Sequence, residues 1–69
     1  MSAIHKIGQK IRAVRKAQGL TQEQLAAMCG VGVRFLREVE KGKEAAQIGK
    51  VLHVLKMLGL EIRIQGEPL

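Results

Sequence analysis

Residues 21–42, TQEQLAAMCGVGVRFLREVEKG, decide the fold of this 69-residue chain. Thr21 is a good N-cap and Gln24, three residues later, can complete a capping box, so a helix is expected to begin at Gln22. Gly30 stands where a left-handed residue commonly ends a helix. The apolar side of this helix would consist of Leu25, Ala26 and Met28. The stretch therefore begins with one short, capped helix.

A second helix is expected over residues 33–41, after a tight turn at residues 29–31. Leu36 and Val39 are spaced i, i+3 and would face inward, and Gly42 would end the helix. Two short helices joined by a glycine turn form the helix-turn-helix motif. The second helix of that motif enters the major groove of DNA.

The same stretch also carries a family resemblance. The pattern L-T-Q-E-Q-L-A-x-x-x-G-V-x-x-x-x-L-x-x-V-E-K-G resembles the Cro/repressor-type helix-turn-helix family. The matching positions are Leu20-Thr21-Gln22, Leu25-Ala26, Gly30-Val31, Leu36 and Val39-Glu40-Lys41-Gly42. Gly32 departs from the family, in which Ser or Thr is usual at this N-cap. Glycine permits the cap geometry but offers no hydroxyl to a DNA phosphate.

The remaining helices follow from the spacing of apolar residues. One is expected over residues 4–18 and another over residues 46–58, each followed by a glycine. Their inward stripes would consist of Ile4, Ile7, Ile11 and Val14 in the first helix, and of Ile48, Val51, Leu52, Leu55 and Leu58 in the other. The chain is thus expected to be a single, mainly α, four-helix domain over residues 1–69, helical over residues 1–59.

Residues 60–65 change period and are typical of a strand, because apolar and polar residues alternate. The strand is expected to be ended by Gly66 and Pro68. No other strand is expected in the chain, so its backbone groups and its apolar face need a partner. The preferred partner is the same strand of a second copy, with Leu60, Ile62 and Ile64 as dimerisation residues. The alternative is a frayed tail.

This C-terminal strand extends the resemblance to the HipB-like antitoxins. In that branch the strand builds an intermolecular sheet, and the protein neutralises a HipA-type kinase toxin while it represses its own operon. The resemblance therefore implies a homodimeric, autoregulatory repressor with a HipA-like toxin as a protein partner.

The charge of the chain favours a polyanionic partner. Twelve Lys and Arg oppose six Glu and no Asp, which gives a formal net charge of +6 and a pI near 10.1. Such a balance is typical of nucleic-acid binders, although a merely solubilising surface would look similar. The chain has one Phe and no Trp or Tyr. Binders of single strands and RNA loops depend on such aromatic side chains for stacking, so double-stranded DNA is favoured.

Nothing in the sequence indicates catalysis, a metal or a cofactor. The chain has no Ser/His/Asp set and no P-loop, and His5, Cys29 and His53 lack the spacing of a zinc site. No apolar run approaches the ~20 residues of a membrane span. The single cysteine and the lack of a signal peptide favour the cytoplasm, with association to the nucleoid when the protein is bound to DNA. A non-enzymatic protein is therefore expected.

The outward residues of the second motif helix are the expected DNA readers, and they are Val33, Arg34, Arg37 and Glu38. Arg34 is the best candidate, because its fork matches O6 and N7 of guanine. Val33 would touch a thymine methyl group and Arg37 would hold a phosphate. Glu38 would contact DNA or orient an arginine. Phe35 could belong to the core, to the rim of the core or to the DNA contact.

Phosphate contacts are expected on both sides of the reading helix. Gln22 begins the preceding helix, where N–H groups and the helix dipole favour an anion, and the resemblance implies that it touches the DNA backbone. Lys41 and Lys43 follow the reading helix and would hold a phosphate, or else lie in a solvated loop. The resemblance also implies that Arg15 pairs with Glu40, which is a structural role.

Together these features predict a homodimeric, sequence-specific repressor whose two reading helices enter successive major grooves of a palindromic operator. The alternative is a protein-interaction adaptor that binds mainly a protein partner and has only non-specific affinity for DNA. Binding to structured RNA is the least favoured alternative, because the chain lacks aromatic residues for stacking.

Overall fold

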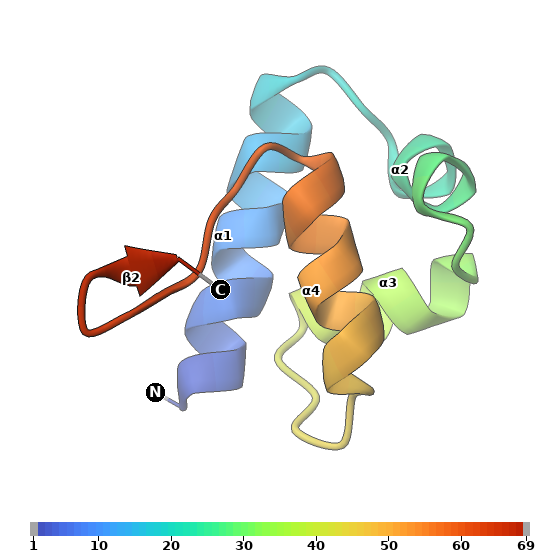
Figure 1. Cartoon of the computed structure of the whole chain (residues 1–69). Coiled ribbons are helices and arrows are strands. Elements are labelled where there is room, and N and C mark those ends of the chain that lie inside the picture. Colours follow the sequence, from blue (N-terminus) through green and yellow to red (C-terminus); the bar gives the residue numbers. More distant parts are fainter. Residues whose placement is uncertain (1, 69) are drawn as a thin grey trace.

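The computed structural model describes residues 2–68 and consists of four helices followed by a small hairpin (Figure 1). The helices are α1 (Ala3–Ala17), α2 (Gln22–Cys29), α3 (Val33–Glu40) and α4 (Ile48–Met57). The strands are β1 (Arg63–Ile64) and β2 (Glu67–Pro68). The expectation of a mainly α, four-helix fold with a short C-terminal strand is confirmed, and α2 and α3 form the helix-turn-helix.

Local signals in the sequence set the geometry of the motif. The Thr21 hydroxyl accepts a hydrogen bond from the N–H of Gln24 at 3.0 Å, and the Gln24 side chain accepts one from the N–H of Thr21 at 2.9 Å. The expected capping box is therefore formed. Gly30 ends α2 with a φ of +67°, the left-handed conformation that was expected there. Gly32 caps α3 with an extended backbone.

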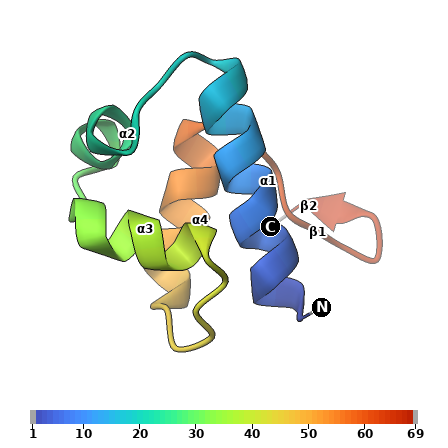
Figure 2. The ribbon, with the colours of Figure 1, turned by 180° about the vertical axis from the view of Figure 1, so that it is seen from behind.

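The core lies where the four helices meet. Helix α3 packs against α1 and α2, and α2 also packs against α4. Figures 1 and 2 show α2 and α3 together on one side of the molecule and the hairpin on the other. Each helix contributes to the fully buried side chains, which are Ile11, Leu25, Leu36, Val39, Val51 and Val54.

Two apolar residues that were expected in the core are exposed. Met28 is 47% exposed, and Cys29 is buried in its place because it lies one helical turn after Leu25. Ile48 is 62% exposed because α4 begins there, two residues later than expected, so this side chain lies at the end of the helix. The buried stripe of α4 consists of Val51, Val54 and Leu55, and Leu58 is buried at the C-cap.

The other helix boundaries shift by one residue. Helix α1 begins at Ala3 because the hydroxyl of Ser2 accepts a hydrogen bond from the N–H of His5 at 3.3 Å. Helix α3 ends at Glu40, and Gly42 follows with a φ of +85°. These shifts leave the arrangement of the motif unchanged.

The C-terminal segment differs from the expected lone strand. Within the expected range 60–65, only Arg63–Ile64 is a strand, and it pairs antiparallel with Glu67–Pro68 of the same chain. The expectation that this strand has no partner within its own chain is therefore wrong. Gln65 and Gly66 form the turn with φ values of +52° and +86°, as the central residues of a type I′ hairpin turn do. Pro68, which was expected to end the strand, lies in β2.

Candidate nucleic-acid interface

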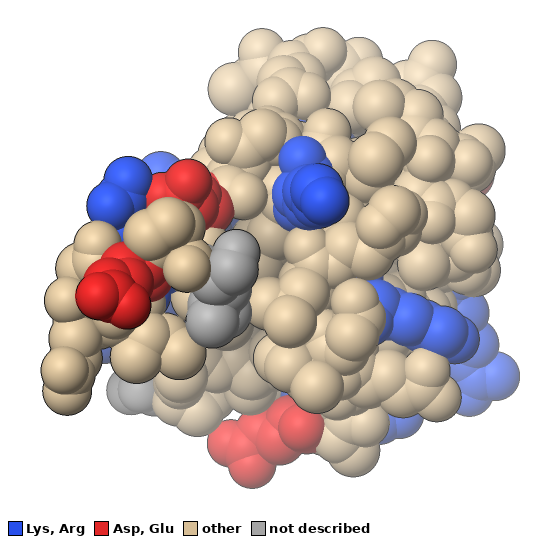
Figure 3. All heavy atoms as spheres, viewed as in Figure 1, with Lys and Arg blue, Asp and Glu red and all other residues tan. Residues whose placement is uncertain are grey.

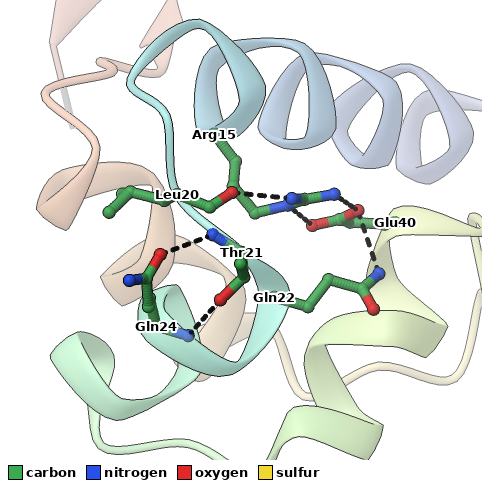
Figure 4. Close-up of polar contacts among 6 residues, drawn as sticks. All are labelled: Arg15, Leu20, Thr21, Gln22, Gln24 and Glu40. Atoms are coloured by element: carbon green, nitrogen blue, oxygen red, sulfur yellow. Dashed lines mark hydrogen bonds and ion pairs between the residues drawn. The ribbon is translucent and has the colours of Figure 1, made fainter.

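A buried ion pair joins α1 to α3 (Figure 4). Arg15 Nε donates to Glu40 Oε2 at 2.7 Å, and Arg15 Nη2 donates to Glu40 Oε1 at 3.0 Å. Arg15 Nη1 donates to the carbonyl oxygen of Leu20 at 2.8 Å, which also ties the α1–α2 connection. The two side chains are only 9% and 3% exposed. The hydrogen bonds that Arg15 donates to Glu40 raise the pKa of Arg15, and the structural pairing that the family resemblance implied is confirmed.

The same carboxylate holds Gln22 at the beginning of α2. Gln22 Nε2 donates to Glu40 Oε1 at 3.2 Å (Figure 4). A primary amide has two N–H groups, so a second N–H of Gln22 is available to another acceptor. Because the beginning of a helix favours an anion, the position of Gln22 suits a phosphate oxygen.

A surface hollow beside this network brings together residues from three helices. It is lined by Arg12, Gln22, Arg37, Glu40 and Lys41. Arg15, which lies outside the lining, balances the negative charge of Glu40. The hollow therefore contains three further cations beside Gln22, which are Arg12, Arg37 and Lys41. This hollow combines Gln22, Arg37 and Lys41, all expected to contact DNA, in one place.

Arg12 also lines this hollow, although the sequence did not single it out as a DNA contact. The spacing of the sequence does place Arg12 near Arg15, because residues three apart lie on neighbouring sides of a helix. What the sequence could not supply is that this side of α1 faces α3. Packing of α1 against α3 places Arg12 beside the motif.

The residues along α3 differ in their surroundings. The Arg34 side chain is 89% exposed, and Arg37 is exposed as well. Val33 is half-buried and packs against the core, so only part of it can meet a ligand. Arg34 Nε lies 3.5 Å from Glu38 Oε1, and Lys43 Nζ donates to Glu38 Oε2 at 3.1 Å. The hydrogen bond from Lys43 lowers the pKa of Glu38.

Phe35 belongs to the rim of the core. It is half-buried and packs against the buried cluster, and Lys50 Nζ lies 5.6 Å from the centre of its ring. This distance is within the range of a cation–π contact. Of the three roles considered for Phe35, the structure supports the rim.

The expected dimerisation residues lie away from α3 and do not share one environment. Leu60 and Ile62 are half-buried against the core of their own chain, whereas Ile64 is 60% exposed. Figure 3 shows that the face carrying α4 has few charged atoms. Its largest group of basic atoms lies toward the side where Figure 1 places α3. The structure thus separates the two sets of candidate residues.

Two further features are absent from residues 2–68, a cluster of metal ligands and a helix that could span a membrane. No three His, Cys, Asp or Glu side chains there are grouped so that they could hold a metal ion. None of the four helices is both long and apolar enough to cross a membrane. Cys29 is buried, and this burial raises the pKa of its thiol.

Known proteins share the sequence of the motif. A helix-turn-helix family profile matches residues 11–65. The uncharacterized HTH-type transcriptional regulator y4mF of Sinorhizobium fredii (strain NBRC 101917 / NGR234) is 55% identical over 58 residues, which are 84% of this chain and 76% of that protein. The uncharacterized HTH-type transcriptional regulator YazB of Bacillus subtilis (strain 168) is 49% identical over 35 residues, which are 51% of each chain.

Solved structures share the fold. A chain in the HipA-HipB-O2-O3 complex superimposes with a TM-score of 0.81 over 93% of this chain and 90% of that chain, with 19% identity, which is a likeness of fold alone. The restriction-modification controller protein C.AhdI from Aeromonas hydrophila gives a TM-score of 0.73 with 33% identity, over 84% of this chain and 88% of that chain. With the profile match, the identity to y4mF and the geometry of α2 and α3, the chain belongs to the Cro/repressor-type helix-turn-helix family.

Proposed function

We propose that this protein is a sequence-specific DNA-binding repressor that inserts α3 into the major groove. The observation that carries the proposal is the exposed basic side of α3 next to a hollow with three cations around Gln22. Direct reading of bases needs exposed donors on an element that fits the groove, and positioning needs cations beside it for phosphates. Helix α3 supplies the exposed donors, and the hollow supplies the cations.

In this proposal each residue of the site has its own role. Arg34 reads guanine through O6 and N7, and the exposed part of Val33 meets a thymine methyl group. The residues of the hollow hold one stretch of the phosphate backbone, and they are Arg12, Gln22, Arg37 and Lys41. Because this contact is electrostatic, affinity falls steeply as salt rises.

The repressor acts as a homodimer on a palindromic operator, with its two copies of α3 roughly 34 Å apart. The C-terminal end supports this assembly. One edge of β1 is taken by β2, and no strand within residues 2–68 pairs with its other edge, which suits a strand from a second copy. Beside it lies a groove lined in part by Leu52, Leu60 and Ile62, and Ile64 adds an exposed apolar side chain.

The protein regulates its own operon and serves as the antitoxin of a HipA-like kinase. Support for this more specific role comes from the shared fold with a chain of the HipA-HipB-O2-O3 complex. The alternative is an adaptor for a protein partner with only non-specific affinity for DNA. Three apolar side chains are exposed and favour this alternative, Met28 on α2 and Ile48 and Met57 at the two ends of α4.

Titration of two DNA duplexes across a salt series tests the proposal. One duplex is the segment immediately upstream of the protein's own coding region, and the other is its scrambled sequence. A preference of 10³-fold or more at physiological salt is expected, as is typical of specific binders. The mass of the specific complex should correspond to two chains per duplex. Equal and salt-sensitive binding to both duplexes would favour the adaptor instead.

Arg12 gives a prediction about phosphate binding. Arg12→Ala should weaken binding to the upstream duplex and to its scrambled form by the same factor, and should lower the slope of log affinity against log salt by about 1. Lys10→Ala is the matched control, because Lys10 lies two residues away on nearly the opposite side of α1. It removes the same charge and should leave the slope close to that of the parent. Equal slopes for the two variants would contradict the place given to Arg12.

A further inference from the structure

Three charged side chains, those of Arg34, Glu38 and Lys43, form a row of ion pairs on the surface at α3. Glu38 is shared by two cations, since Arg34 Nε lies 3.5 Å from its Oε1 and Lys43 Nζ donates to its Oε2 at 3.1 Å. The N–H of Lys43 also donates to the carbonyl oxygen of Glu38 at 3.1 Å, which fixes the backbone of Lys43 against the end of α3. Each oxygen of the Glu38 carboxylate therefore has its own cation.

The contact with Glu38 involves one particular edge of Arg34. A guanidinium group has five N–H donors, one on Nε and two on each terminal nitrogen. Glu38 lies nearest to Nε, so the two terminal nitrogens remain available as a fork. A guanine edge requires such a fork, because O6 and N7 accept from two parallel donors. An arginine that meets Glu38 at its Nε edge therefore keeps the fork that a guanine edge requires.

Arg34 would have little order without this contact. Its side chain is 89% exposed, and Glu38 follows it by four residues, an orientation of acid and base that is the weaker of the two on a helix. Lys43 restrains the Glu38 carboxylate, because it donates to Oε2, the oxygen that Arg34 does not approach. Lys43 lies outside α3 and is therefore in a position to influence the order of Arg34 through Glu38.

We propose that Lys43 and Glu38 are positioning residues for sequence discrimination. Lys43 holds Glu38, Glu38 holds Nε of Arg34, and Arg34 presents its terminal nitrogens to a guanine in the major groove. The proposal rests on the DNA-binding function proposed above and deepens it. It gives Lys43 a task beyond the phosphate contact expected from its place in the sequence.

The Glu38→Gln variant distinguishes a role of Glu38 in positioning Arg34 from simple repulsion between Glu38 and DNA phosphates. The substitution keeps the shape of the side chain and removes a negative charge from the surface that meets DNA. If Glu38 only repelled phosphates, affinity for all duplexes would rise alike. Under the proposal, affinity for random DNA rises, while the preference for guanine at the position facing Arg34 falls by about tenfold, toward the value of Arg34→Ala.

Lys43→Ala separates positioning from phosphate binding, with Lys41→Ala as the matched control. Lys43→Ala should lower the guanine preference at that same position, and Lys43→Arg should restore it. Lys41→Ala removes the same charge two residues away and should weaken all duplexes alike without changing the preference. In the Glu38→Gln background, Lys43→Ala should lower the guanine preference no further, because Lys43 acts only through Glu38.

The experiment is selection of binding sites from a random duplex library, followed by titration of single-base variants of the selected site. Loss of guanine preference in Glu38→Gln and Lys43→Ala at one position supports the proposal. A uniform loss of affinity for Lys43→Ala, or a uniform gain for Glu38→Gln, overturns it. If the parent protein selects no sequence at all, the DNA-binding function itself is wrong.

An NMR measurement without DNA directly tests the contacts from Lys43 to Glu38 and from Glu38 to Arg34. In the parent protein, the Nε–H of Arg34 should exchange with water more slowly than that of exposed Arg37. Glu38→Gln and Lys43→Ala should each bring the rate for Arg34 up to that of Arg37, with the helix signals unchanged. An Arg34 rate equal to that of Arg37 in the parent would overturn the positioning role.

Discussion

Glu40→Ala is expected to lower the free energy of unfolding by about 3–5 kcal/mol, the usual effect of removing one partner from a buried ion pair. The Arg15 side chain is only 9% exposed and would lose two of its hydrogen bonds, so its charge would remain buried with the Leu20 carbonyl alone. A single core of this size rarely supplies more than about 3–5 kcal/mol, so much of the variant should be unfolded at room temperature. Thermal and urea unfolding followed by circular dichroism measure the change.

Two further variants define the cause of this loss. Glu44→Ala removes the same charge from an exposed loop position and should change stability by less than about 0.5 kcal/mol. Replacing both partners, with Arg15→Met and Glu40→Leu, should recover much of the stability, because no unpaired charge is then left inside. An unchanged melting temperature for Glu40→Ala would show that the ion pair contributes nothing to the fold.

The helix-turn-helix could be predicted because its signals are local. The capping box of Thr21 and Gln24 and the left-handed Gly30 each depend on a few neighbouring residues, and both are formed as expected. The buried positions Leu36 and Val39 follow from the period of one helix. The pairing of Arg15 with Glu40 came from a family resemblance, since the spacing of the residues alone does not bring α1 to α3.

The hairpin could not be predicted with the same rules. Its turn places Gln65 and Gly66 at positive φ, and Gln-Gly is a weaker signal than the Asn-Gly or Asp-Gly typical of such turns. Arg63 Nη1 donates to the carbonyl oxygen of Gly66 at 3.1 Å and so supports the turn through a side chain. Proline is tolerated in an edge strand, which allows Pro68 to lie in β2.

The parts of the candidate site that come from different elements were also beyond the sequence. Arg12 joins the hollow only because α1 packs on α3, and Lys43 reaches Glu38 only because the chain turns at the end of α3. Both residues are charged and exposed, so composition gives no sign of which surface they share. Tertiary packing, rather than residue type, assigns their neighbours.

Gly8→Ala should destabilise the protein by about 1–3 kcal/mol or more, although alanine is the better helix former by about 1 kcal/mol. Gly8 is buried within α1, and a Cβ there would overlap the carbonyl oxygen of Val39 and lie 3.1 Å from that of Glu40. These are backbone atoms, so the clash cannot be relieved by a rotamer change. Helices α1 and α3 would have to move apart, which would also disturb the ion pair that joins them.

Gly49→Ala is the matched control for this prediction. Gly49 lies within α4, and a Cβ there would meet no atom within 4 Å beyond its neighbours and the backbone of its own helix, so alanine should stabilise the helix by about 0.5–1 kcal/mol. The same substitution should therefore change urea stability in opposite directions at the two sites. If Gly8→Ala were as stable as Gly49→Ala, the close approach of α1 and α3 would be wrong, and with it the packing that places Arg12 beside α3.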